Sequence, residues 1–199
     1  MPKARRVGIA LFLGIYMLSG SGCAVKVPLS PDIPNLQFGK KLPVEAALLI
    51  TEETRNYIFK GKPDTLVGSG GSYELAFGEA LERTSVEIFS QIFDKITLVR
   101  TPEEARKFKI FIEPKVEDYH FRFENPILRP LTVFSKIRIH TRVGSRDVTI
   151  KDIKEESDES EYSASKHGEI ASAQLVHSLG KIAIQLSEDA SVRQLIENK

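Results

Sequence analysis

Cys23 carries the only thiol in the 199-residue chain. A single cysteine cannot form an internal disulfide, and it cannot by itself build a thiolate zinc site, which needs several ligands at set spacings. A catalytic thiol needs a partner base and a formed pocket, whereas Cys23 ends an apolar run and precedes every segment with a folding pattern. The thiol is therefore better explained as an attachment point than as a nucleophile.

Two Ser-x-x-Lys sequences, Ser163 to Lys166 and Ser178 to Lys181, have the nucleophile spacing of penicillin-binding enzymes. On a helix this spacing places serine and lysine on one face, where a neutral lysine could accept the serine proton. The companion Ser-Asp-Asn and Lys-Thr-Gly elements are missing, and Lys181 lies opposite the apolar stripe of its segment. A cell-wall enzyme using Ser163 or Ser178 is thus a third hypothesis, behind two non-enzymatic ones.

Other patterns that could carry chemistry are incomplete. The glycine-rich stretch VGSGGSYE, Val67 to Glu74, lacks the Gly-Lys-Ser/Thr ending of a phosphate loop, so a turn is favoured. The four histidines have no metal-ligand spacing, and the acidic run from Glu155 to Glu161 lacks the residue order of a calcium loop. The sequence predicts no catalytic residue, no metal and no cofactor.

The first 22 residues have the layout of an export signal. Three basic residues, Lys3, Arg5 and Arg6, precede the apolar run Val7–Leu18, which is too short to span a bilayer comfortably as a permanent helix. Small residues then lead up to the cysteine, and cleavage there would leave residues 23–199. An ordinary signal peptide cut elsewhere in this run, or an uncleaved N-terminal anchor, is the alternative.

Ser21-Gly22-Cys23 resembles the lipobox of bacterial lipoprotein signals, although Gly20 stands where a leucine-like residue is usual. The resemblance implies that residues 1–22 are a lipoprotein signal peptide and that Cys23 receives a diacylglyceryl group and becomes the new N-terminus. Two or three palmitate-like chains, each worth about 0.8 kcal/mol per buried methylene, anchor a protein stably. Ala24 stands where Asp would signal inner-membrane retention, so by analogy we expect the outer membrane, with the domain facing the periplasm.

The charge balance argues against nucleic acid as a partner. The chain has 28 Lys and Arg and 27 Asp and Glu, and loss of the three basic residues of the signal changes its formal charge from +1 to −2. No block rich in Lys and Arg follows the signal, whereas nucleic-acid binders concentrate such residues to neutralise phosphates. The expected partners are the membrane, through the lipid on Cys23, and an envelope protein, with a lipid as an alternative ligand.

The mature chain divides into a tether and a domain. Residues 23–43 form the lipidated N-terminus and a segment in which Pro28, Pro31 and Pro34 favour extended backbone. We expect a semi-rigid spacer, or a disordered tail, that holds the domain off the membrane. Residues 44–199 are expected to form one periplasmic domain with a sizeable core.

Apolar spacing predicts a series of strands and helices in this domain. The predicted strands lie at 44–50, 96–99, 108–123, 131–139 and from 148 onward, and the predicted helices at 77–93, from 101 onward and at 169–196. The aromatic residues after Asp118 have the opposite parity to Ile110 and Ile112, which predicts a bulge or bend between Pro114 and Asp118. The order predicts an α+β fold: a two-layer domain with a mostly antiparallel sheet and two main helices packed on one face.

Three apolar residues lie where polar ones are expected. Ile170 and Ile184 fall on the face of the last helix away from its apolar stripe, and Phe134 lies in the polar phase of its strand. Single exposed apolar residues are ordinary. If these three cluster in the fold, they mark a patch for docking a partner.

Several segments resemble the YajG-type family of bacterial envelope lipoproteins. They are the lipobox, Val44–Leu48, Phe77–Leu81, the strands between Phe108 and Ile150, and SLGKIAIQLSEDASVRQLIENK at the C-terminus. The resemblance implies an envelope lipoprotein without a catalytic signature. The order of helices and strands is also similar to auxiliary lipoproteins of lipid-trafficking ABC systems and to accessory lipoproteins of secretion machines.

The leading hypothesis is a non-enzymatic, membrane-anchored envelope lipoprotein that acts as an accessory or structural component of an envelope assembly. The alternative is an auxiliary lipid- or ligand-binding lipoprotein of an ABC transport system. The alternative requires an open apolar cavity between the helix layer and the sheet.

Overall fold

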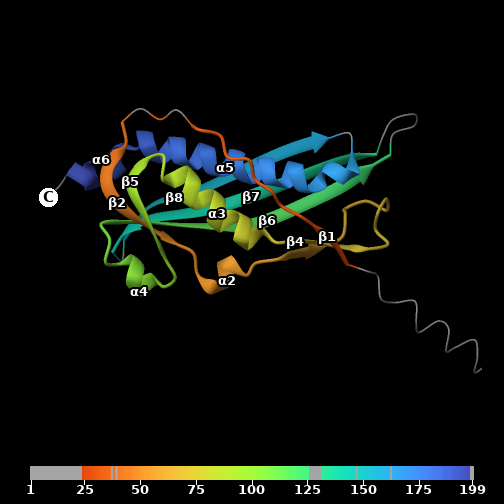
Figure 1. Ribbon diagram of the computed structural model, residues 1–199, viewed down its shortest axis with the longest axis horizontal. Helices are drawn as coiled ribbons and strands as arrows, with labels where there is room; N and C mark the ends of the chain where they lie inside the picture. Colours follow the sequence, from red (N-terminus) through yellow and green to blue (C-terminus); the bar gives the residue numbers. More distant parts are fainter. Residues whose placement is uncertain are drawn as a thin grey trace, which may run out of the picture.

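Long antiparallel strands run along the length of the domain (Figure 1). The computed structural model describes residues 24–36, 38, 40–125, 131–146, 148–161 and 163–197. In chain order the elements are β1 (Ala24–Val27), β2 (Leu42–Leu49), α2 (Glu52–Arg55), β3 (Phe59–Gly61), β4 (Ser72–Leu75), α3 (Phe77–Phe89), β5 (Phe93–Val99), α4 (Pro102–Ala105), β6 (Ile110–Glu124), β7 (Thr132–Ser145), β8 (Val148–Glu161), the short 3-10 helix η1 (Ala164–Lys166), α5 (His167–Glu188) and α6 (Ala190–Glu197). No helix within these described ranges is both long and apolar enough to cross a membrane.

Five strands form the main sheet, in the order β5-β2-β6-β7-β8. β2 runs parallel to both β5 and β6, whereas β6, β7 and β8 form an antiparallel meander. The two main helices, α3 and α5, pack against each other and on one face of this sheet (Figure 1). The predicted α+β fold with two layers is confirmed, and the sheets are largely antiparallel. The parallel pairs around β2 were not part of the prediction.

The predicted irregularity is present in β6. The pairing of β6 with β7 shifts between Val116 and Asp118. Because side chains alternate along a strand, this shift turns two runs of opposite parity toward one core. Ile110 and Ile112 before the shift and Tyr119 after it are all at most 2% exposed.

A second sheet of three short strands, absent from the prediction, includes the beginning of the described chain. Its order is β1-β4-β3, with β1 parallel to β4 and β3 antiparallel to β4. The register places Ala24 directly beside Ser72. The packed part of the chain therefore already includes residues that precede the predicted boundary at residue 44.

Residues 28–36 lie across the helix layer and do not form the free spacer that their prolines predict. The backbone amide of Ser30 donates to the Ser172 hydroxyl of α5 at 2.9 Å. Three apolar side chains of this segment pack against the core: Leu29, Ile33 and Leu36. The tether prediction is thus wrong for this part of residues 23–43, because the segment covers apolar surface that the helices leave open.

The long helix predicted at the C-terminus is two helices, α5 and α6. Asp189, between them, has extended backbone, and its carboxylate accepts hydrogen bonds from the amides of Ser191 at 2.9 Å and Val192 at 3.1 Å. Such a cap satisfies amides that the start of a helix leaves unpaired. Lys151 Nζ lies 2.5 Å from the same carboxylate, which ties the break to β8.

Candidate functional site on the uncovered face of the sheet

Beyond Phe111, near the start of β6, the outer face of β6, β7 and β8 has no described helix packed on it. α3 and α5 cover the inner face, and α4 packs on β2 and β5 and meets β6 at Phe111, near the start of that strand. The small apolar cluster under α4 consists of Ala47, Leu49, Val99, Ala105 and Phe111. Alternation along β7 therefore directs one set of side chains outward: Phe134, Lys136, Arg138, His140 and Arg142.

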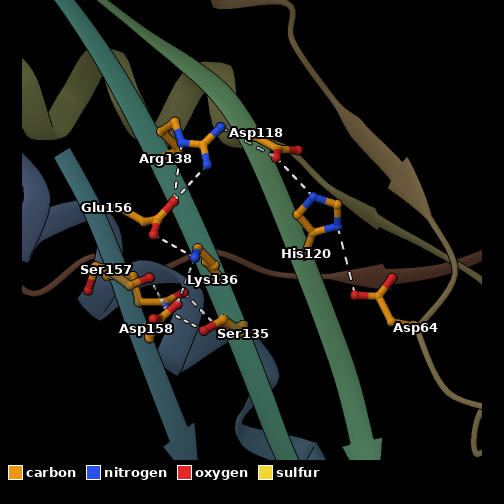
Figure 2. Close-up of polar contacts among 10 residues, drawn as sticks. Asp64, Asp118, His120, Ser135, Lys136, Arg138, Glu156, Ser157 and Asp158 are labelled. Atoms are coloured by element: carbon orange, nitrogen blue, oxygen red, sulfur yellow. Dashed lines mark hydrogen bonds and ion pairs between the residues drawn. The ribbon is translucent and has the colours of Figure 1, made fainter. Parts of the chain in front are cut away.

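Charged side chains of opposite sign face one another across these strands (Figure 2). Arg138 donates to Glu156 at 2.7 Å and lies 4.0 Å from Asp118. Lys136 Nζ lies 2.5 Å from Glu156 and 4.0 Å from Asp158. Hydrogen bonds from Lys136 and then from Arg138 lower the pKa of Glu156, so this carboxylate stays ionised at neutral pH. Exposed pairs of this kind add little stability, but they give the face a fixed pattern of charge.

A hollow of about 610 Å³ lies at one end of this face, between β6, β7, β8 and the segment that joins β3 to β4. The guanidinium carbon of Arg122 lies 4.5 Å from the ring centroid of Phe134. His120 Nε2 lies 2.9 Å from Asp118, and its Nδ1 lies 3.8 Å from Asp64 (Figure 2). A guanidinium over an aromatic ring combines apolar area with directed donors, and both residue types are enriched in protein interfaces.

The structure separates the three residues predicted to dock a partner. Phe134 is half-buried and lines the hollow on the outer face. Ile184 is 45% exposed, but it lies on α5, which covers the inner face. Ile170 is 5% exposed and belongs to the core, so the prediction that it lies on the surface is wrong. The three residues form no common patch, and Cys23 lies outside the described residues.

Ile170 is buried because it lies one turn before Gln174, on the side of α5 that packs on the main sheet, where the Gln174 amide donates to the carbonyls of Ser135 at 2.7 Å and Ser157 at 3.0 Å. The main sheet packs against one side, and the chain around Pro28 packs against another: a Cβ added to Gly168 would lie 2.1 Å from the Pro28 carbonyl oxygen. The buried surface of α5 is therefore wider than the single apolar stripe on which the prediction depended.

Neither Ser-x-x-Lys sequence forms a serine–lysine pair. Ser163 Oγ lies 2.6 Å from Ser165 Oγ, while the Lys166 ammonium lies 3.9 Å from a glutamate. Ser178 is fully buried and its hydroxyl has no hydrogen-bond partner among the described residues, whereas Lys181 is exposed. Within the described ranges no group of three potential ligands among His, Cys, Asp and Glu is placed to hold a metal ion.

A second concave site lies where β1 meets the start of α5, and the sequence analysis missed it. His167, the first residue of α5, is 2% exposed, and its Nε2 lies 2.7 Å from the Tyr119 hydroxyl. Burial lowers the pKa of His167 to about 4, so the imidazole is neutral at pH 7. Its Nδ1 has no hydrogen-bond partner in the part of the chain that the structure describes. An adjoining, mainly apolar pocket of about 420 Å³ is lined in part by Val25, Val27 and Tyr73.

This apolar pocket is not where the alternative hypothesis placed its cavity. It lies at the end of the helix layer, beside the small sheet. Fully buried side chains fill the space between α3, α5 and the main sheet, among them Phe77, Ile137, Leu175 and Leu179. The pocket residues come from segments far apart in the chain, so no local spacing in the sequence could have revealed the site.

Comparison with known proteins supports the fold. No family model matches the sequence, and no curated protein matches it. The structure is similar to that of a Xanthomonas campestris protein of family DUF330, at 8% identity and a TM-score of 0.53, over 82% of this chain and 92% of that chain. A minor lipoprotein from Acinetobacter baumannii is also similar, at 11% identity and a TM-score of 0.35, over 75% of this chain and 94% of that chain. The YajG-type family stays a prediction from the sequence.

Proposed function

We propose that this chain is a non-enzymatic outer-membrane lipoprotein of the YajG type, anchored by acyl chains on Cys23, with its domain in the periplasm. The anchor rests on the signal that ends in Ser21-Gly22-Cys23, and the outer membrane rests on Ala24. The domain serves as an accessory or structural component of an envelope protein assembly. The observation that carries this role is the outer face of β6, β7 and β8, which presents paired charges and a hollow and, beyond Phe111, has no described helix packed on it.

The chemistry of this face favours a protein partner. Its acidic and basic residues alternate, so it offers complementary contacts rather than the one-signed surface that nucleic acid requires. Arg122 and Phe134 in the hollow provide the arginine and aromatic contacts that tend to dominate binding energy at interfaces. We therefore place the centre of the docking surface at this pair.

The test is photocrosslinking in living cells with a photoreactive amino acid at one of two positions. Position 134 lies in the hollow, and position 184 is a matched apolar position on the helix side. Each variant is made with Cys23 intact and with Cys23→Ala, and adducts are identified by mass spectrometry. We expect one dominant protein adduct from position 134, little from position 184, and loss of the adduct in Cys23→Ala.

The outcomes separate the parts of this proposal. An adduct from position 184 alone would move the docking surface to the helix side. An adduct that persists unchanged in Cys23→Ala would contradict the proposed role of the Cys23 anchor. No specific protein adduct from either position would contradict the role in an assembly.

A second candidate is an auxiliary lipid- or ligand-binding lipoprotein of an ABC transport system, favoured by the apolar pocket beside His167. Its volume of about 420 Å³ lies within the range of small-ligand sites, and His167 beside it has one buried nitrogen without a hydrogen-bond partner among the described residues. Native mass spectrometry of protein extracted from membranes tests it. A bound lipid that is lost when Val27→Asp closes the pocket to apolar chains would favour this candidate, and repeated recovery of empty protein would count against it.

A further inference from the structure

The segment between β3 and β4, residues 62–71, forms a well-held turn. The Asp64 amide donates to the Phe121 carbonyl at 2.9 Å, and the Thr65 hydroxyl donates to the Phe123 carbonyl at 2.8 Å. Beyond these contacts the chain reverses between Leu66 and Ser69, where the Ser69 amide donates to the Leu66 carbonyl at 3.2 Å. Gly68 has a φ of 78°, which a turn of this kind requires and which side chains disfavour.

This turn presents two apolar side chains to solvent. Leu66 is 92% exposed and Val67 is 39% exposed. Neither contributes much to the core, and the fixed backbone keeps them from folding back onto it. Single exposed apolar residues are ordinary, but Leu66 and Val67 are adjacent and project together from a hydrogen-bonded turn, which gives them the form of a small contact surface.

The turn lies on the side of the domain where the anchor enters. β1 and β4 are parallel, so the chain enters both strands from the same end of the small sheet, and Ala24 pairs with Ser72. Cys23 is one residue before Ala24, about 3.8 Å away, and paired strands are about 4.8 Å apart. The turn precedes Ser72 and lies beside the start of β1 at one end of the molecule (Figure 1).

We infer that Leu66 and Val67 insert into the interfacial region of the membrane that holds the Cys23 acyl chains, as a second, non-covalent contact. This inference rests on the proposed anchor, since acyl chains on Cys23 would hold the start of β1 at the level of the lipid headgroups. Lys26 on β1 and Lys62 just after β3 are both exposed, and ammonium groups there match an anionic leaflet. This contact fixes the orientation of the domain on the membrane. The ends of β7 and α5 that lie farthest from the turn then point away from the membrane.

The test uses full-length, membrane-extracted protein in which a single thiol is introduced at Leu66→Cys and labelled with an environment-sensitive fluorophore. Acylation would block Cys23, so the introduced thiol is the reactive one. The matched control is Val148→Cys, because Val148 is 65% exposed and lies roughly 40 Å away at the opposite end of β8. The proteins are reconstituted into vesicles of phosphatidylethanolamine with a minority of phosphatidylglycerol, and vesicle flotation is measured in parallel.

We expect both proteins to float with the vesicles, with a several-fold fluorescence rise and quenching by headgroup-proximal spin labels at position 66 only. Protein that floats while position 66 stays as hydrated as position 148 would overturn the membrane contact and leave the anchor intact. Protein that does not float would overturn the anchor, and with it this inference. Because Leu66 is exposed, its replacement is not expected to disturb folding, and circular dichroism of the labelled protein checks this.

Discussion

The Tyr119 hydroxyl lies 2.7 Å from Nε2 of His167, and this contact joins the second half of β6 to the first residue of α5. Both side chains are 2% exposed, and the Phe121 ring centroid lies 4.5 Å from that of the imidazole. Burial raises the pKa of the Tyr119 hydroxyl and lowers the pKa of His167 to about 4. Two neutral groups thus meet in the core, and a charge on either one would destabilise the fold.

The first prediction is that His167 makes stability fall in mild acid. Unfolded histidine titrates near pH 6.5 and folded His167 near 4, so between these values the unfolded chain binds more protons. The free energy of unfolding should therefore fall as the pH drops from about 6.5 to about 4, by about 3 kcal/mol from this residue. Urea unfolding at a series of pH values measures the fall, and His167→Gln should flatten it.

His177→Gln is the control for this prediction. His177 is exposed on the same helix, so this variant tests whether a change in the pH dependence of the unfolding free energy is specific to the buried histidine. The account of His167 fails if both variants retain the wild-type slope.

The second prediction concerns Glu82 of α3 and Arg100 at the end of β5. Arg100 Nη1 and Nη2 lie 2.5 Å and 3.0 Å from the two oxygens of Glu82, and Nη1 also donates to the Ile50 carbonyl at 3.2 Å. Glu82→Gln should lower the free energy of unfolding by about 1–3 kcal/mol at pH 7, because it replaces charge-assisted hydrogen bonds with weaker ones. Urea unfolding at pH 7 measures the loss.

The stability contributed by this pair is also lost in acid, but the cause is the loss of the charge on Glu82, whereas His167 destabilises the fold by gaining a charge. The hydrogen bond from Arg100 lowers the pKa of Glu82, so its stabilisation is present above the ordinary value of 4.5 and is lost as the pH falls through the lowered value. Glu103→Gln is the control, since Glu103 is 72% exposed and lies 3.9 Å from Arg106. Its effect should be near zero, and equal losses in the two variants would argue against a special role for Glu82.

The third prediction tests whether residues 28–36 are held on α5. A Cβ at Gly168 would lie 2.1 Å from the Pro28 carbonyl oxygen, so Gly168→Ala should push this segment off the helix. Hydrogen exchange at the Ser30 amide should become faster, and proteases should cut residues 28–36 more readily.

Gly180 offers a matched substitution on the same helix. A Cβ there would meet Leu36 Cδ1 at 3.5 Å, an ordinary contact, and alanine favours the helix by about 0.5–1 kcal/mol over glycine. Gly180→Ala should therefore stabilise the protein and leave exchange at Ser30 slow. Slow exchange in Gly168→Ala as well would mean that the segment is not held in this way.

The sequence predicts those parts of the fold in which apolar residues recur at a regular spacing and neighbouring residues determine the structure. In β7, Val133, Ile137 and Ile139 alternate with polar residues, so their burial on one face follows from strand geometry. The bulge in β6 follows equally, because Ile112 and Tyr119 must share a core despite opposite parity.

The parts that the sequence does not predict depend on contacts between distant segments. β1 and β4 have four residues each, too few for a periodic signal, and the pairing of Ala24 with Ser72 is a long-range event. Ile170 lies outside the apolar stripe when α5 is considered alone, and its burial becomes clear only when Gln174, one turn later, is seen to bond to β7 and β8. The turn at Leu66 is signalled by its glycines, but its outward direction is fixed by hydrogen bonds to β6.

The central claim is that Cys23 is the membrane anchor, and mass spectrometry of the N-terminal peptide from membrane-extracted protein tests it most directly. The account predicts a mature chain that begins at Cys23, with a diacylglyceryl thioether on the sulfur and an acyl group on the new amino terminus. A chain that begins at another residue, or that carries Cys23 as an unmodified thiol, would contradict it.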